Sequence, residues 1–179
     1  MSSPNNNPPP PGESTLPGGG FQPKRVAVLG IGNELNGDDG VGVLVARRLK
    51  SLLADRPDLA GQVLIFEAAT APESFTGPLR RFRPDLVIMV DAAYLENEPG
   101  AVEWIDWETT DGLTASTHGL PPSLLAKFLM VELGCRVRLI GIQPVHLDFD
   151  RPMSAALVQA VERVAQDLAS INFGLNFRF

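Results

Sequence analysis

The sequence predicts an α/β protein, a three-layer sandwich in which a mostly parallel, twisted sheet of about five strands carries helices on both faces. Short β-branched apolar segments alternate along the chain with segments whose apolar residues recur at helical spacing. Residues 85–93, DLVIMVDAA, are apolar almost throughout, which is typical of a central parallel strand covered on both faces. The length of 179 residues suits one domain with a proper hydrophobic core.

The N-terminal half is expected to fold as two strands, residues 25–32 and 62–68, and two helices, residues 40–55 and 72–83. Asp38 and Asp39 precede the first helix, where either side chain is placed to cap the amide groups of the first turn. The second helix is short and is expected to be interrupted near Gly77 and Pro78.

The C-terminal half is expected to contain the strands 85–93, 100–107 and 136–144 and the helices 121–134 and 152–171. The strand 100–107 alternates more in polarity than the others, which favours a place at the edge of the sheet. The helix 121–134 begins with proline and ends at Gly134, the usual asymmetry of helix ends.

The segments outside this pattern are expected to be tails. Residues 1–22 are almost wholly Pro, Asn, Ser and Gly, so they cannot bury enough apolar surface to offset their chain entropy. We therefore expect a disordered N-terminal tail over 1–22, a single α/β domain over 23–171, and a phenylalanine-rich C-terminal tail over 172–179.

Composition excludes several classes of function. The net charge of −6 repels nucleic acid and anionic membranes, and no apolar run is long enough to cross a bilayer. Cys135 is the single cysteine, which fits a reducing compartment and is expected to lie in the core. With no basic-then-apolar signal pattern at the N-terminus, we expect a cytoplasmic protein.

Polar side chains cluster where ligands bind in such folds, at the carboxyl ends of the strands. Asp38 and Asp39 follow the first strand, Asp91 ends the third, and His118 precedes the helix 121–134. Each residue taken alone has a structural explanation, such as helix capping or a hydrogen bond to a loop. Two acids and a histidine from three separate loops at one sheet edge indicate a functional site.

Two kinds of chemistry suit these residue types. Carboxylates and an imidazole can ligate a divalent metal such as Ni, Zn, Mn or Fe, and a pair of carboxylates can act as general acid and base on water. A nucleotide site is disfavoured because GIGNELNG is not the G-x-G-x-x-G pattern and no lysine follows it. No segment has the form of a serine nucleophile elbow, and only His118 and His146 could serve as a base.

Four motifs occur in an order that resembles the hydrogenase maturation endopeptidases: VLGIGNELNGDDGVG, VIMVDAA, STHGLP and GIQPVHLDFDRPMS. The APES and GIQP segments are most similar to the branch that serves formate-hydrogenlyase-type hydrogenases. The resemblance covers about residues 24–170 and leaves out both tails. Glu34 departs from the family motif, which is apolar at this position, and adds a fourth carboxylate to the loop.

The resemblance implies an endopeptidase that removes a C-terminal extension from the nickel-loaded precursor of a [NiFe] hydrogenase large subunit. It implies that Asp39, Asp91 and His118 are both the catalytic residues and the side chains that meet the nickel of the substrate. The enzyme would hold no tightly bound metal of its own and would act as a monomer. Whether an acid activates water or nickel polarises the scissile carbonyl is left open.

Two other functions stay open beside this one. The first is a hydrolase with its own Zn or Mn at Asp39, Asp91 and His118. The second is a nickel-dependent chaperone that docks on the large subunit without cutting it. The metal content of the purified protein separates the endopeptidase from the metallohydrolase, and cleavage of a nickel-loaded precursor separates it from the chaperone.

Overall fold

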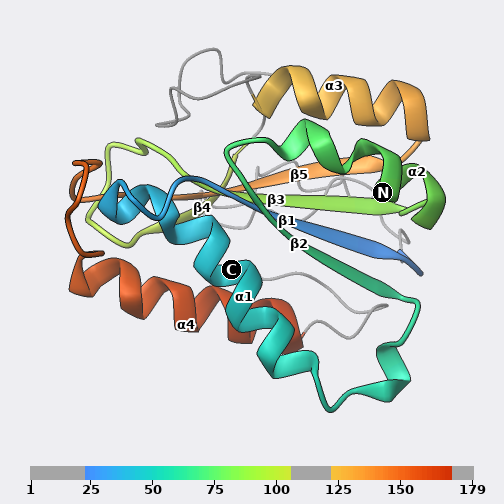
Figure 1. The fold of residues 1–179 in the computed structure, drawn as a ribbon, viewed down its shortest axis with the longest axis horizontal. Coiled ribbons are helices and arrows are strands. Elements are labelled where there is room, and N and C mark those ends of the chain that lie inside the picture. Colours follow the sequence, from blue (N-terminus) through green and yellow to red (C-terminus); the bar gives the residue numbers. More distant parts are fainter. Residues whose placement is uncertain (1–22, 106–121, 171–179) are drawn as a thin grey trace, which may run out of the picture.

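The computed structural model of the protein describes residues 23–105 and 122–170. In this part of the chain a five-stranded sheet has the order β2-β1-β3-β5-β4 (Figure 1). The strands are β1 Val26–Ile31, β2 Val63–Ala69, β3 Leu86–Ala92, β4 Val102–Ile105 and β5 Arg136–Ile142. The pairs β1–β2, β1–β3 and β3–β5 are parallel, and β4 lies antiparallel to β5 at one edge. The mostly parallel sheet and the edge position of β4 confirm the predictions.

Helices cover both faces of the sheet, so the fold has three layers. The α-helices are α1 Val41–Leu53, α2 Thr76–Phe82, α3 Pro122–Leu133 and α4 Ala155–Ser170. The short 3-10 helices are η1 Gly37–Gly40, η2 Pro57–Leu59 and η3 Pro72–Phe75. Figure 1 shows α1 and α4 on one face of the sheet and α2 and α3 on the other. The predicted fold class, a three-layer α/β sandwich, is confirmed.

Two hydrophobic layers hold the helices to the sheet, because successive side chains of a strand point to opposite faces. Val26 and Val28 of β1 pack in the layer under α1 and α4, whereas Ala27 and Leu29 pack in the layer under α2 and α3. Every residue of β3 is buried, as expected for a central strand with helices on both sides. Cys135 is buried in the second layer, which confirms its prediction as a core residue.

The predicted helix 72–83 is a 3-10 turn followed by α2. The change occurs at Thr76, so Gly77 and Pro78 lie in the first turn of α2. Proline is tolerated there because amide groups in the first turn have no acceptor within the helix. In the neighbouring helix α3, Gly134 has a φ of 64° and its amide donates to the Met130 carbonyl, which ends α3 where the sequence predicted.

The loops after β1, β3 and β5 meet at the carboxyl edge of the sheet, at the left of Figure 1. Among the described residues, no helix has the length and apolar character needed to cross a membrane. The predicted tails 1–22 and 172–179 lie outside the described residues and stay predictions.

Helix α1 packs against the sheet through Gly42. A Cβ atom at this position would lie 2.1 Å from the Val90 carbonyl oxygen and 2.4 Å from the Ile31 carbonyl oxygen. Both atoms belong to the backbone of neighbouring strands and cannot move aside singly. The absence of a side chain at Gly42 therefore sets how closely the first turn of α1 approaches β1 and β3.

We predict that Gly42→Ala lowers the free energy of unfolding by about 2 kcal/mol or more, because overpacking a rigid contact costs roughly 1–3 kcal/mol. Gly77→Ala in α2 is the matched control, since its nearest neighbour would be the flexible Arg81 guanidinium at 3.9 Å. The control should be neutral or slightly stabilising, because alanine favours helix. Chemical denaturation of both variants measures the difference, and equal stabilities would contradict the close packing of α1.

Candidate active site at the carboxyl edge of the sheet

Two of the predicted site residues lie together at the carboxyl edge. Asp39 belongs to η1, which follows β1, and Asp91 is the penultimate residue of β3. Because β1 and β3 are neighbouring parallel strands, the residues after them approach one another. Both residues are buried, with exposures of 2% for Asp39 and 0% for Asp91. The third predicted site residue, His118, lies in the segment 106–121, outside the described residues.

The loop after β1 shapes the position of Asp39 through its backbone. Gly32 has a φ of 128°, and a Cβ atom on it would lie 1.7 Å from the Asp39 carbonyl oxygen. Only glycine therefore allows the chain to fold back on itself at this point. The amide of Asn33 donates a hydrogen bond of 3.1 Å to Asp39 Oδ2, which fixes the carboxylate against the loop.

Asp91 is a carboxyl group in an apolar setting. Its Oδ1 accepts a hydrogen bond of 2.9 Å from the amide of Ala92. Its Oδ2 is buried and accepts no hydrogen bond from any residue that the structure describes. Burial first, and the negative charge of Asp39 second, raise the pKa of Asp91 to about 8. In the free protein at neutral pH, Asp91 therefore keeps its proton.

The neighbouring residue Asp38 has a different role. It is fully buried, and its Oδ2 accepts hydrogen bonds from the amides of Val145 at 2.8 Å and His146 at 3.3 Å. Its Oδ1 accepts a third hydrogen bond from the amide of Ser154 at 2.7 Å. Asp38 thus joins the loop after β1 to the long loop between β5 and α4.

The predicted capping of α1 is therefore wrong for both acids. No side-chain hydrogen bond caps η1 or α1, because the carboxylate of Asp38 is directed to a distant loop and Asp39 accepts from Asn33. A cap is a local contact that the sequence suggests at any aspartate before a helix, whereas the contacts of Asp38 span 107 to 116 residues. The local pattern could not distinguish these two roles.

The fourth carboxylate of the loop, Glu34, faces α1 and forms an ion pair. Arg47 donates two hydrogen bonds to it, of 2.7 and 2.8 Å, and also bonds Glu67 of β2. The Arg47 guanidinium holds the pKa of Glu34 below its ordinary value. Glu34 is thus accounted for by a surface ion-pair network that joins the β1 loop, α1 and β2.

Two polar residues after β5 also belong to this edge. Gln143 accepts a hydrogen bond of 2.7 Å from the amide of Leu95 and donates one of 3.1 Å to the Pro144 carbonyl, so it joins the loops after β3 and β5. His146 lies next, and its Nδ1 is buried with no hydrogen-bond partner in the described part of the chain. The role of Gln143 was not predicted from the sequence, although a polar residue directly after a buried strand is a usable signal.

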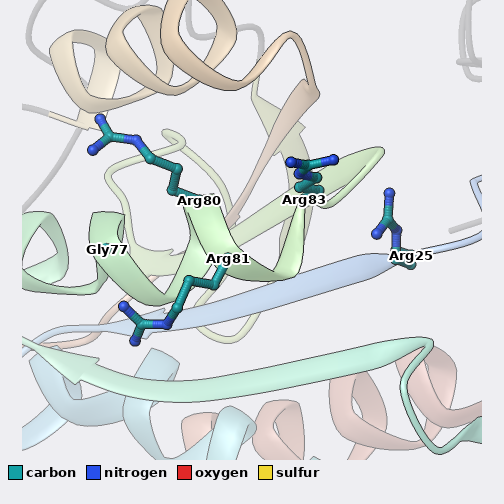
Figure 2. A pocket seen from close by; sticks show the side chains of 5 residues that line it. All are labelled: Arg25, Gly77, Arg80, Arg81 and Arg83. Atoms are coloured by element: carbon teal, nitrogen blue, oxygen red, sulfur yellow. The ribbon is translucent and has the colours of Figure 1, made fainter.

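An open pocket of about 590 Å³ lies elsewhere, lined by Gly77 and by the arginines 25, 80, 81 and 83 (Figure 2). Arg25 precedes β1 and Arg83 precedes β3, so the pocket belongs to the amino edge of the sheet, opposite the acids. In Figure 2, Arg80 and Arg81 point to different sides of α2, and Arg80 pairs with Glu132 at 3.2 Å. The guanidinium groups do not converge on one point, and the pocket is not part of the acid site.

The arrangement at the carboxyl edge can perform two kinds of chemistry. A protonated and an ionised carboxyl group side by side can supply the acid and the base for hydrolysis, as paired carboxylates do in other hydrolases. Two carboxylates can also attract a cation, although the described residues contain no group of three or more His, Cys, Asp or Glu side chains that could hold a metal ion. Because His118 lies outside the described residues, this result does not test a site made of Asp39, Asp91 and His118.

The fold and the site define the protein as a three-layer α/β protein with a buried pair of acids at the carboxyl edge of its sheet. The family model described as "Hydrogenase maturation protease" matches residues 43–171, which is more than half of the chain. The protein belongs to the hydrogenase maturation protease family and is a peptide-bond hydrolase.

Similar proteins cover most of the chain. The curated "Hydrogenase 3 maturation protease" of Escherichia coli K12 is 32% identical over 142 residues, which are 79% of this chain and 86% of that protein. The crystal structure of the [NiFe] hydrogenase maturation protease HycI from Thermococcus kodakarensis superposes with a TM-score of 0.73 at 38% identity, covering 82% of this chain and 91% of that one. The solution structure of the endopeptidase HycI from E. coli has a TM-score of 0.69 at 32% identity, covering 81% and 89%.

We predict that Asp38→Asn lowers the free energy of unfolding by about 2–3 kcal/mol, because the amide offers one acceptor oxygen and turns an NH2 group toward backbone donors. Asp148→Asn is the control: Asp148 lies in the loop between β5 and α4 that Asp38 contacts, its side chain is 61% exposed, and it pairs with Arg151 on the surface. The control should change stability by less than about 0.5 kcal/mol. Urea denaturation measures both, and a silent Asp38→Asn would exclude the proposed link between the loops.

We predict a pH-dependent stabilisation in Asp91→Asn. The ordinary pKa of 3.8 rises to about 8 on folding, so between these pH values the unfolded chain ionises while the folded chain keeps its proton. Wild-type stability therefore falls as pH rises from about 4 to 8, and asparagine removes this loss. The variant should unfold at a higher temperature than wild type at pH 8, with a smaller difference at pH 5. A difference independent of pH would contradict the raised pKa.

Proposed function

We propose that the protein removes a C-terminal extension from the nickel-loaded precursor of a [NiFe] hydrogenase large subunit. The observation that carries the proposal is the buried pair Asp39 and Asp91 at the carboxyl edge, in a chain of the maturation protease family. The named relatives support the kind of substrate, since one is the hydrogenase 3 maturation protease and another a [NiFe] hydrogenase maturation protease.

In this proposal Asp39 and Asp91 recognise the nickel ion of the substrate. A free Asp91 holds its proton, because its surroundings are apolar and Asp39 is negatively charged. A divalent cation brought near by the substrate would favour ionisation of Asp91, release its proton and attract both carboxylates. Oxygen donors, with His118 as the proposed third group, bind nickel less tightly than the thiolates of a substrate site. The enzyme would therefore contact the nickel ion without removing it from the substrate.

The same side chains can take part in peptide hydrolysis. The attack of water on a carbonyl needs a base to accept a proton and an acid to protonate the leaving amine. With the cation present both acids would be ionised, so one of the carboxylates would accept a proton from the attacking water. The carboxylic acid formed in this way would then protonate the leaving amine. Nickel near the scissile carbonyl would in addition polarise that bond. We further propose that the enzyme acts as a monomer in the cytoplasm. Its single cysteine excludes an internal disulfide framework, which fits a reducing compartment.

We predict that Asp39→Asn, Asp91→Asn and His118→Ala each reduce cleavage of a nickel-loaded large-subunit precursor by at least about 100-fold, the usual loss when one group in acid–base catalysis is removed. Asparagine keeps the shape of each acid but removes the charge that would attract the cation. Gel mobility of the precursor over time measures the cleavage, and circular dichroism verifies that each variant is folded.

Asp55→Asn is the matched control, since Asp55 is exposed and follows the far end of α1. It should cleave as wild type does. Full processing by Asp39→Asn would remove this residue from the proposed site. One zinc or manganese ion per purified chain would favour a hydrolase with its own metal, and binding of the precursor without any cleavage would favour a chaperone.

A further inference from the structure

Four large apolar side chains are exposed at the carboxyl edge of the sheet. They are Leu35 at 63%, Tyr94 at 51%, Val145 at 54% and Phe149 at 73% exposure. They stand on the loops after β1, β3 and β5, the loops that also surround the acid pair. We name these four residues the apolar rim. Single exposed apolar residues are common, but a group of them beside a buried polar site is typical of a surface that binds a partner.

Hydrogen bonds hold the three loops of the apolar rim in one arrangement. The Leu35 carbonyl accepts from the amide of Asp150 at 2.8 Å, next to Phe149. Asp38 accepts from the amide of Val145, which ties the first loop to the third. The loop that carries Tyr94 is joined to the third loop through the side chain of Gln143. These contacts fix the rim before any partner arrives.

Backbone conformation at two rim neighbours supports a functional role for the loops. Glu96 has a φ of 55° and Asp150 a φ of 58°, a region that residues other than glycine adopt at a cost. Glu96 lies two residues from Tyr94, and Asp150 directly follows Phe149. Such strain persists where the surrounding structure enforces it, and it concentrates at ligand-binding loops. A rim that is already ordered loses little entropy when a partner binds.

We infer that the apolar rim is a docking surface for the hydrogenase precursor itself, occupied by an apolar segment of its polypeptide near the scissile bond. This inference rests on the proposed function. Its basis is position: the loops after β1, β3 and β5 carry the rim, and they lie at the same edge of the sheet as Asp39 and Asp91, which the scissile peptide bond has to reach. A second copy of this chain on the rim would instead cover the acids and block the substrate.

The rim and the acids then recognise different features of the same substrate. The acids respond to a cation, whereas burial of Leu35, Tyr94, Val145 and Phe149 against apolar groups does not depend on nickel. The rim therefore binds the precursor with or without its metal, and the acids select the nickel-loaded form for cleavage. Docking of the nickel-free precursor is a property that the acid pair alone does not predict.

The test compares the double variant Leu35→Ser/Phe149→Ser with the control Val131→Ser. Val131 is 84% exposed on α3, on a helix that carries none of the rim loops. For the double variant we expect an increase of about tenfold or more in Kd for nickel-free precursor, measured by calorimetry, since buried aromatic and aliphatic anchors dominate such surfaces. With nickel-loaded precursor, KM should rise by a similar factor while kcat changes little, because the rim does not touch the reacting atoms.

Thermal unfolding should be unchanged in both variants, because all three side chains are exposed. Wild-type KM and Kd in the double variant would overturn the docking surface while leaving the proposed function intact. A wild-type protein that neither binds nor cleaves the precursor would overturn both. A wild-type dimer in light scattering that the double variant converts to monomer would assign the rim to self-association and overturn the inference.

Discussion

The carboxylate of Asp38 is the constraint on which the carboxyl edge depends. Three backbone amides, those of Val145, His146 and Ser154, donate to one buried side chain. A buried carboxylate is stable only when such donors replace its hydration. The loop before α4 has to fold over η1 to supply them, and this places the residues after β5 beside the loop after β1. The position of Asp39, the next residue, follows from this contact.

The two adjacent aspartates of η1 thus have different roles. Asp38 has its hydrogen bonds satisfied by the backbone and stabilises the fold, whereas Asp39 acts on Asp91, whose own ionisation is disfavoured by burial. The free protein bears the cost of an acid held protonated at the end of its central strand. A cation beside Asp91 would favour its ionised form and remove this cost. A group that is unfavourable until a ligand binds is typical of a site organised for function at the expense of stability.

The sequence was sufficient for features that depend on local pattern or on strand order. The apolar run of β3, the glycine stop of α3 and the edge position of β4 follow from composition and spacing, whereas the antiparallel direction of β4 was not predicted. The proximity of Asp39 and Asp91 follows from the rule that parallel strands end at one edge. The roles of Asp38 and Glu34 did not follow, because a bond to Ser154 and a pair with Arg47 are tertiary contacts that no local motif encodes. The match to the family model begins at residue 43 and does not include Asp39, so the proposed role of Asp39 rests on its position beside Asp91.

A division between docking and metal recognition has a kinetic consequence. Contacts made equally by the nickel-free and nickel-loaded precursor raise the affinity for both and cannot distinguish them. Discrimination must come from interactions that exist only with the metal, and in the proposed function the buried acids Asp39 and Asp91 would make them. Weak oxygen ligands can perform this task only if another surface supplies the affinity for a large protein. The exposed apolar side chains on the loops around Asp39 and Asp91, which hydrogen bonds join to one another, are suited to supply this affinity. The acids would then need only to recognise the metal and not to bind it tightly.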